Sequence, residues 1–200
     1  HMLETLSRNG DGRYAFLNDL SSVDEMFSRK LAGALRPAAA DLKVQIEFNP
    51  ERVELYRQVG FEKHQLKKEY FRDNSIDAAE IAAAEAGNAL YVVKVNPRGK
   101  GDLGVFRIRY KEPETGDYKE REWPLAYRRE VVAFADSSSA MRLAVHAASF
   151  AEWLSESPYG AGFESEEAEA DLRVLRNEFP EEAPVDRLSN MIGQARSISR

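Results

Sequence analysis

Short segments in which apolar and polar residues alternate dominate the middle of this 200-residue chain. From Leu42 to Phe48 every second side chain is apolar, and Lys43, Gln45 and Glu47 stand between them. A period of two places alternate side chains on opposite faces of a strand, so we expect one buried face here. The same alternation predicts strands over residues 53–59 and 103–110. The apolar run at 89–95, which ends in turn residues, predicts another strand, and residues 118–123 are expected to form the return strand of a hairpin, with a further strand over 125–134. Strands at such short spacing favour an antiparallel β-sandwich.

The segments between these strands are less regular. Residues 61–80 read as a polar connection, and the alanine-rich stretch at 81–86 is expected to form a helical turn or a loop. Turn residues follow most of the strands, as at Pro113–Asp117, which predicts a hairpin. The sandwich is therefore expected to span residues 38–136.

The last third of the chain changes to helical spacing. Ser137, Ser138 or Ser139 can cap a helix that runs to about Glu156. Apolar residues cover more than one face of this helix, so it should be largely buried against the sheet, with Trp153 in the core. Two further helices are expected to open near Ser165 and Pro184. The predicted fold class is α+β, with the helices of residues 137–200 packed on the β-sandwich.

A strand and a helix precede the sandwich. Residues 9–12 indicate a turn, residues 13–17 a strand, and residues 22–35 carry apolar side chains at helical spacing. The pair His1-Met2 has the form of a cloning remnant and carries no functional weight. One strand and one helix cannot bury their own apolar faces, so residues 1–37 should belong to something larger.

Composition and charge exclude several classes of function. The chain carries 34 acidic and 28 basic side chains, a formal charge of −6, and residues 151–200 alone hold 11 acidic and 5 basic groups. Binding of duplex nucleic acid needs a concentrated basic patch, so we expect no nucleic-acid partner. The absence of cysteine excludes disulfides and thiol catalysis. No apolar run reaches the ~18 residues of a membrane span.

Two oxygen-rich stretches are candidate metal sites. Residues 136–140 are similar to a metal-adhesion motif, but Ala140 has no oxygen where such a motif needs a hydroxyl, and a helix follows. Helix capping is the preferred interpretation. Residues Asp73–Glu80 offer oxygens at alternate positions, yet Ala78 and Ala84 replace the glycine and glutamate of a calcium loop. A noncanonical calcium loop and a solvated turn both stay open there.

Other reactive or aromatic residues have structural interpretations. His64 and His146 lack the spacing of metal ligands or of a nucleophile–base pair, so surface or structural roles are expected. An aromatic and basic patch could be formed by Tyr118, Trp123, Tyr127 and Arg128-Arg129. Sheet packing explains the aromatic residues of this group better. We predict no catalytic, cofactor-binding or metal-binding residue in this chain.

Three stretches resemble a bacterial family of von Willebrand factor type A domain proteins. Residues 10–17 and the helix after them look like the last strand and helix of the A-domain. Residues 41–50 and 56–62 look like the start of the uncharacterised C-terminal domain that follows it. Residues 144–159 look like that domain's final helical part. The resemblance covers nearly the whole chain, and its most specific part is 41–62, whereas residues 82–88 depart from the family pattern.

The resemblance implies a noncatalytic accessory domain that positions an A-domain for binding a protein partner. Mg²⁺ or Ca²⁺ would belong to the part of the A-domain that should precede this chain, and a cell-envelope or secreted location is implied. A sandwich that itself binds peptides or glycans is the alternative, and a hydrolase ranks third because no catalytic set is readable. Without its native sheet, the helix at 22–35 would need a substitute partner: a groove on the sandwich or a second copy of the chain.

Overall fold

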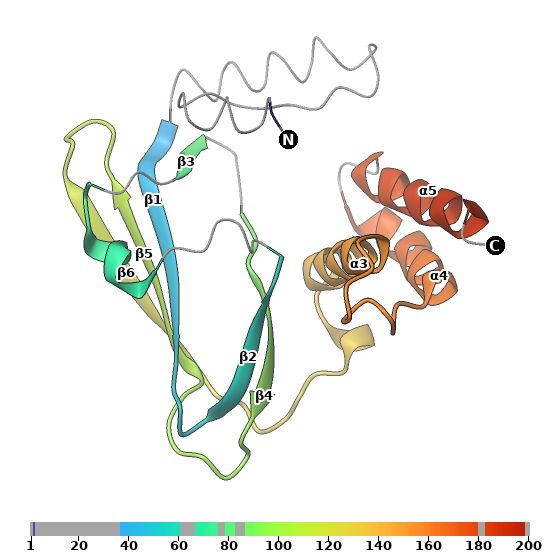
Figure 1. Cartoon of the computed structure of the whole chain (residues 1–200), viewed down its shortest axis with the longest axis horizontal. Coiled ribbons are helices and arrows are strands. Elements are labelled where there is room, and N and C mark those ends of the chain that lie inside the picture. The colour runs from blue at the N-terminus through green and yellow to red at the C-terminus, as the bar shows by residue number, and fades with distance from the viewer. Residues whose placement is uncertain are drawn as a thin grey trace. The chain divides into compact units, whose positions relative to one another are not determined.

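The computed structural model describes residue 2 and residues 37–60, 67–75, 79–82, 87–179 and 183–198. The predicted A-domain strand and helix of residues 1–37 lie, apart from Met2 and Pro37, outside these residues, and so does the proposed dimer contact at 22–35. Among the described residues, six strands come first along the chain and three α-helices follow (Figure 1). None of these helices has the length and apolar character needed to cross a membrane.

The strands form two antiparallel sheets. They are β1 (Pro37–Phe48), β2 (Val53–Val59), β3 (Ala79–Ala82), β4 (Leu90–Val95), β5 (Gly104–Lys111) and β6 (Tyr118–Leu125). Four strands pair in the order β3-β1-β5-β6, and β2 pairs with β4. The helices are α3 (Ser139–Leu154), α4 (Ser165–Leu175) and α5 (Ala183–Ile198). The predicted α+β class, with antiparallel sheets and C-terminal helices, is confirmed.

The chain divides into two compact units, each built from separated segments. The described part of the first unit is residues 37–43, 79–82 and 109–119. The described part of the second is residues 44–60, 67–75, 87–108, 120–179 and 183–198. The domains predicted from the sequence, with boundaries after residues 37 and 136, are instead each one continuous segment. These boundaries stay predictions.

The first half of β1 departs from the simple alternation that its sequence predicts. Asp41 has a φ of +48°, and the pairing of β1 with β3 shifts register between Ala39 and Leu42. Beyond this irregularity the side chain of Lys43 is fully buried, whereas Val44 is 47% exposed. The prediction of a single apolar buried face on this strand is therefore wrong, because a buried ionic contact, Lys43 with Asp41, takes a place that alternation assigns to solvent.

At its other end, β1 is joined to the two-stranded sheet by aromatic packing. The ring centroid of Phe48 lies 4.5 Å from that of Tyr56 on β2 and 5.5 Å from that of Tyr91 on β4. Gly99, in the loop after β4, passes so close to this region that a Cβ atom would lie 2.0 Å from the backbone oxygen of Glu51. Only glycine permits that approach.

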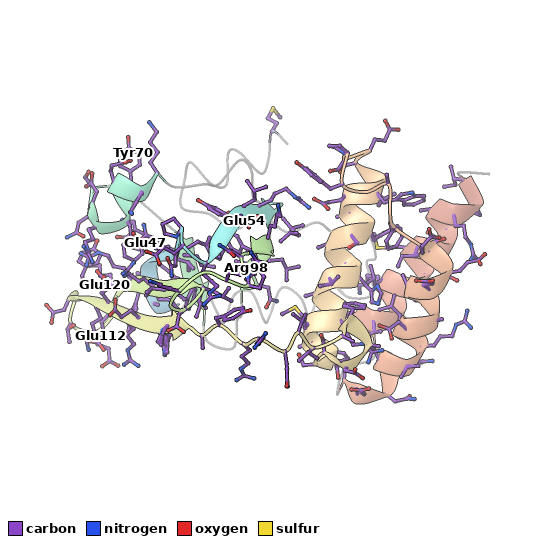
Figure 2. All side chains as sticks on the ribbon, turned by 90° about the horizontal axis from the view of Figure 1, so that it is seen from below. Glu47, Glu54, Tyr70, Arg98, Glu112 and Glu120 are labelled. Carbon is purple, nitrogen blue, oxygen red and sulfur yellow. The ribbon has the colours of Figure 1, made fainter. Side chains whose placement is uncertain are left out.

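Charged side chains line the exposed surface of these strands (Figure 2). Glu47 on β1 accepts from Arg107 on β5 and from Lys68, both at 2.7 Å. Arg72 pairs with Glu120 on β6 at 2.8 Å. Lys68 and Arg72 belong to a 3-10 helix, η3 (Lys68–Arg72), which lies in the stretch predicted to be an irregular polar connection. Its buried anchor is Phe71.

Two sequence predictions about strands are wrong. Residues 126–133 form no strand: β6 ends at Leu125, and the chain bends at Arg129 and Glu130 before a short 3-10 helix, η4 (Phe134–Asp136). Residues 79–82 form β3, where a helical turn or loop was expected from 81 onward. The backbone of β1 supplies the pairing groups for β3, and such pairing overrides the helical preference of alanine.

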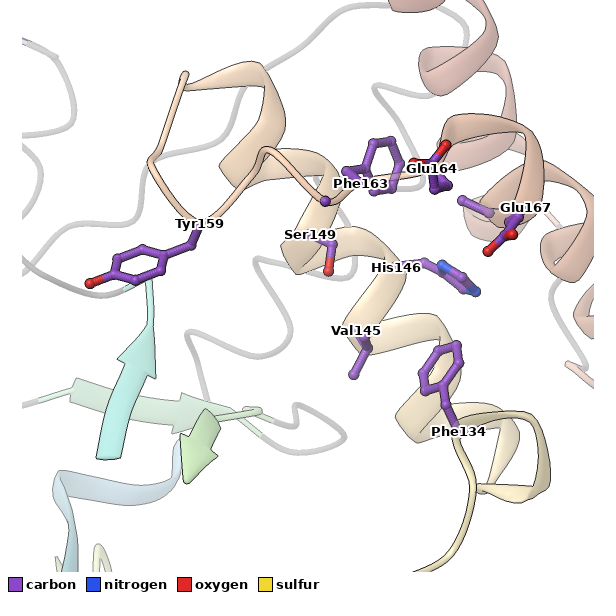
Figure 3. Close-up of a pocket in the computed structure, with 10 residues that line it drawn as sticks. Phe134, Val145, His146, Ser149, Tyr159, Phe163, Glu164 and Glu167 are labelled. Atoms are coloured by element: carbon purple, nitrogen blue, oxygen red, sulfur yellow. The ribbon is translucent and has the colours of Figure 1, made fainter. Parts of the chain in front are cut away.

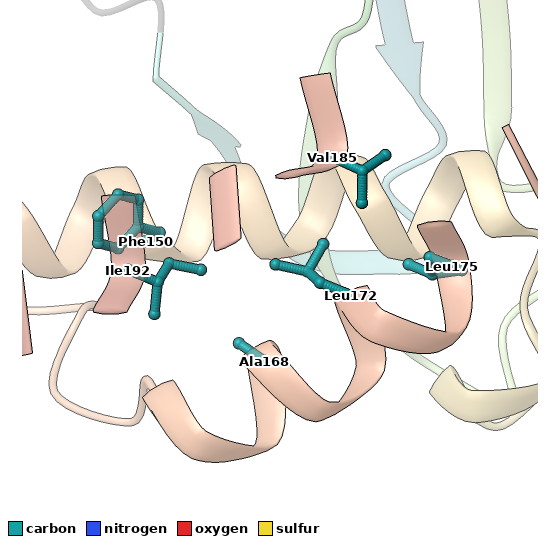
Figure 4. Close-up of a cluster of buried hydrophobic side chains, with 6 residues drawn as sticks. All are labelled: Phe150, Ala168, Leu172, Leu175, Val185 and Ile192. Carbon is teal, nitrogen blue, oxygen red and sulfur yellow. The ribbon is translucent and has the colours of Figure 1, made fainter. Parts of the chain in front are cut away.

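The three helices have a hydrophobic core of their own (Figure 4). Its buried members come from all three helices: Phe150, Ala168, Leu172, Leu175, Val185 and Ile192. Trp153, predicted to lie in the core, packs against this cluster and is half-buried. The prediction that α3 is largely buried against the sheet is wrong. Its buried residues are His146 and Phe150, the latter in the helical core, and Met141 and Leu154 are exposed.

Candidate functional site

A pocket of about 280 Å³ opens on the helical part of the chain (Figure 3). Its lining comes from η4, α3, the loop after α3 and the first turns of α4: Phe134, Val145, His146, Ser149, Tyr159, Gly162, Phe163, Glu164, Glu167 and Ala168. Helical spacing places Val145, His146 and Ser149 on one side of α3. Gly160 lets the loop return closely, since a Cβ atom there would lie 2.7 Å from the backbone of Glu152.

His146 is buried at the wall of this pocket and is held by a charged pair. Its Nε2 lies 2.7 Å from Oδ2 of Asp171 on α4, which also receives a hydrogen bond from Nε of Arg142 at 3.1 Å. A second nitrogen of Arg142 contacts the other carboxylate oxygen. Burial, and then the positive charge of Arg142, hold the pKa of His146 below its usual 6.5. The imidazole is therefore neutral at pH 7, and it donates to a carboxylate whose charge Arg142 already balances.

The rim of the pocket combines aromatic rings with free carboxylates. Phe134 meets the His146 ring edge-on at 5.3 Å between centroids, and Phe163 packs on the rings of Phe150 and Trp153. Glu164 and Glu167 are exposed, and no described residue forms an ion pair with either. Both lie where α4 begins.

This arrangement has the groups of a binding pocket. Ser149 and His146 both line the pocket, but His146 donates its hydrogen bond to Asp171, and no base among the described residues hydrogen-bonds Ser149. A nucleophile needs a base within hydrogen-bond reach. No three His, Asp or Glu side chains within the described ranges come together as metal ligands. The prediction of no catalytic or metal residue stays a prediction.

A second polar constellation joins β2 to the helical part. The guanidinium of Arg57 makes two hydrogen bonds to the carboxylate of Glu152 on α3, at 2.5 and 3.3 Å. Its Cζ also lies 3.8 Å from the ring centroid of Tyr159. Arg57 and Tyr159 belong to two of the stretches that carried the family resemblance, so the structure brings these distant stretches together.

The sequence-predicted metal candidates have mixed outcomes. Ser138 is the N-cap of α3, and its Oγ accepts from the backbone N–H of Met141 at 3.3 Å, so the capping interpretation of residues 136–140 is confirmed. Asp73 accepts from the backbone and the hydroxyl of Ser75. The side chains of residues 76–80 lie outside the described residues, and so does His64, so the calcium question at Asp73–Glu80 stays open.

The proposed aromatic and basic patch is divided among separate structural contacts. The hydroxyl of Tyr118 donates to Asp41 at 2.7 Å. Trp123 packs on Phe106 of the neighbouring strand, with 5.6 Å between ring centroids, and Tyr127 lies under the guanidinium of Arg52. Arg128 and Arg129 are exposed. Contacts within the fold therefore account for each aromatic ring, in agreement with the preferred interpretation.

Sequence reasoning missed the residues that shape both constellations. Asp171 reads as one more charge on an acidic helix and Glu152 as an ordinary charge on a mainly apolar one, and no local pattern distinguishes them. Arg57 lies in the segment predicted as a strand, residues 53–59, and that pattern does not single it out. A signal was present in the helical positions: Asp171 and the two glutamates at 164 and 167 share one side of α4, where residues three and four apart are neighbours.

Comparison with known proteins places the chain in a family. A family model described as "Uncharacterized protein YfbK, C-terminal" matches residues 33–101 and 93–184. The uncharacterized protein YfbK of Escherichia coli (strain K12) is 30% identical over 143 residues, which cover 62% of this chain and 25% of that relative. The chain thus spans about a quarter of the relative's length. No solved structure matches.

The matched residues include β1, β2 and the helices that build the pocket and the Arg57 contact. The part of the sequence resemblance that pointed to an uncharacterised bacterial C-terminal domain agrees with this match. The chain therefore belongs to the family of YfbK C-terminal domains.

Proposed function

We propose that this domain is a noncatalytic accessory module of a von Willebrand factor type A protein, and that it sets the orientation of an A-domain for binding a protein partner. The family description, a C-terminal domain, and the coverage of only a quarter of the E. coli relative support a role inside a longer protein. Support for the A-domain itself comes from the sequence of residues 10–35, which resembles the last strand and helix of such a domain.

The proposal rests on the buried contacts that Asp41 and Lys43, in the first half of β1, make with each other and with Tyr118. This strand begins at Pro37, directly after the residues that resemble the last A-domain helix. The carboxylate of Asp41 accepts from the hydroxyl of Tyr118 on β6, and the buried ammonium of Lys43 lies 3.3 Å from it. A buried, hydrogen-bonded attachment transmits orientation, whereas a solvated linker would let the two domains rotate freely.

Hydrogen exchange on the full-length protein, measured with and without Mg²⁺, tests this role. If the A-domain reports its metal state through β1, the protection of residues 37–48 changes with Mg²⁺ while that of α4 and α5 does not. Unchanged protection across residues 37–48 would reject the proposal.

A matched pair of variants sharpens the test. Tyr118→Phe removes the hydroxyl that holds Asp41, so it should reduce the Mg²⁺-dependent change in protection. Tyr110→Phe, on the neighbouring strand β5, removes a hydroxyl that makes no hydrogen bond among the described residues, and should leave the response intact. Equal responses in both variants would count against β1 as the transmitting element.

A further inference from the structure

We infer that the pocket on the helical part binds an arginine side chain presented by a basic segment of a partner protein. This site is separate from the proposed positioning of an A-domain by β1, and neither depends on the other. The inference rests on the size of the pocket, its aromatic walls and its unpaired carboxylates.

The size of the pocket selects a small occupant. At about 280 Å³ it lies just below the ~300–1,000 Å³ of pockets that enclose whole drug-sized molecules. A single side chain therefore suits it better than a cofactor or an oligosaccharide. The lining also contains no asparagine or glutamine amide, and its hydroxyls are those of Ser149 and Tyr159.

The charge of the pocket selects a cation. Glu164 and Glu167 are exposed at its edge, and no described basic residue pairs with them. Of the helices that line the pocket, α4 is acidic, since residues 165–175 hold four acidic side chains and one basic one. His146 adds no positive charge, because burial and Arg142 keep it neutral at pH 7. A carboxylate rim with a neutral wall is complementary to a basic partner.

The aromatic walls favour arginine over lysine. Phe134 and Phe163 line the same pocket as the two carboxylates. A planar guanidinium stacks on rings while it bonds a carboxylate with two nitrogens, whereas an ammonium acts as a point charge. The chain uses this combination internally, where Arg57 lies over Tyr159 and bonds Glu152.

Two-dimensional NMR of the ¹⁵N-labelled chain, titrated with N-acetyl-arginine amide, tests the assignment. Saturable shifts should concentrate on amides of residues 134, 145–149 and 162–168. N-acetyl-citrulline amide, the neutral isostere, should bind at least about threefold more weakly, and N-acetyl-lysine amide should also be weaker. Shifts that lie elsewhere, or that are equal for arginine and citrulline, would overturn the site. Equal binding of lysine would overturn the preference for arginine.

A matched pair of variants assigns the effect to the rim. Glu167→Gln should weaken arginine-amide binding at least about threefold, while Glu166→Gln makes the same charge change on the next residue, outside the lining, and should leave binding unchanged. Phe134→Leu tests the ring independently and should also weaken binding. Unfolding midpoints verify that each variant is folded. If Glu167→Gln and Glu166→Gln behave alike and Phe134→Leu has no effect, the inference fails.

Discussion

Arg57 on β2 and Glu152 on α3 form a bidentate ion pair, although 95 positions separate them in the sequence. Both side chains are mostly buried, at 27% and 17% exposure. The ring of Tyr159 covers the guanidinium. A pair of this geometry orients both groups, so it couples the strand to the helix more firmly than an exposed contact would.

Replacing Arg57 should destabilise the chain. Arg57→Ala leaves the carboxylate of Glu152 partly buried without its donor, at an expected cost of about 1–3 kcal/mol in the free energy of unfolding. Arg57→Lys should recover little, because an ammonium cannot make both bonds and stack on Tyr159. Urea denaturation measures the change. Lys68→Ala breaks an exposed pair with Glu47 and serves as control. A loss no larger than that of the control would contradict this role.

The helical core should respond strongly to a single truncation. Leu172 is 1% exposed at the centre of the cluster, so Leu172→Ala should cost about 2–5 kcal/mol through lost burial and the cavity left behind. Val174→Ala, two positions along the same helix and 58% exposed, should change the unfolding midpoint little. Thermal and urea unfolding followed by circular dichroism would compare the two variants. Similar midpoints would place Leu172 outside the core.

Asp41 should be sensitive to loss of charge alone. Asp41→Asn keeps a residue that tolerates the left-handed backbone at φ +48°, but it removes the negative charge beside buried Lys43. We expect a loss of about 1–3 kcal/mol in the free energy of unfolding. Asp117→Asn, on the exposed hairpin, provides a matched control. Equal urea midpoints for the two variants would show that the charge of Asp41 is not needed.

The stability of the chain should fall in mild acid because of His146. Its pKa in the folded chain lies below 6.5, so the unfolded chain binds the proton more readily. Stability is therefore retained above about pH 6.5 and is lost as the pH falls toward the folded pKa of His146. The facing charges are Arg142, Asp171 and Glu167.

His146→Gln should flatten this part of the pH–stability curve, because glutamine keeps a donor for Asp171 and does not titrate. The other histidines, at residues 1 and 64, remain as internal references. An NMR titration of the imidazole gives the folded pKa directly. A measured pKa above 6.5, or the same acid sensitivity in the variant, would refute the expectation.

The strands and helices could be predicted from local pattern, and the contacts that join them could not. Alternation placed β1, β2 and β5, an apolar run bounded by a turn placed β4, the hairpin turn before it placed β6, and serines before an apolar helical pattern placed the start of α3. Burial of Lys43 escaped prediction because it depends on a positive φ at Asp41, a feature of the backbone that side-chain pattern does not report.

The partner of α3 was assigned wrongly for a related reason. An apolar helix must be covered, but the pattern does not say by what. Here α4 and α5 supply the cover, through Leu172, Leu175 and Ile192. The pocket could not be predicted for the same reason. His146 and Asp171 lie 25 residues apart in the sequence, and only the packing of α3 on α4 brings them within 2.7 Å.

The helices α3, α4 and α5 bury their apolar side chains largely in one another. We therefore expect these three helices to unfold as a cooperative unit separate from the strands. Amide protons of these helices should then exchange with a shared free energy that differs from that of the strands. A calorimetric scan would show a van't Hoff enthalpy smaller than the calorimetric one. Loss of the Arg57–Glu152 pair should widen that difference, since it removes a link through which one part stabilises the other.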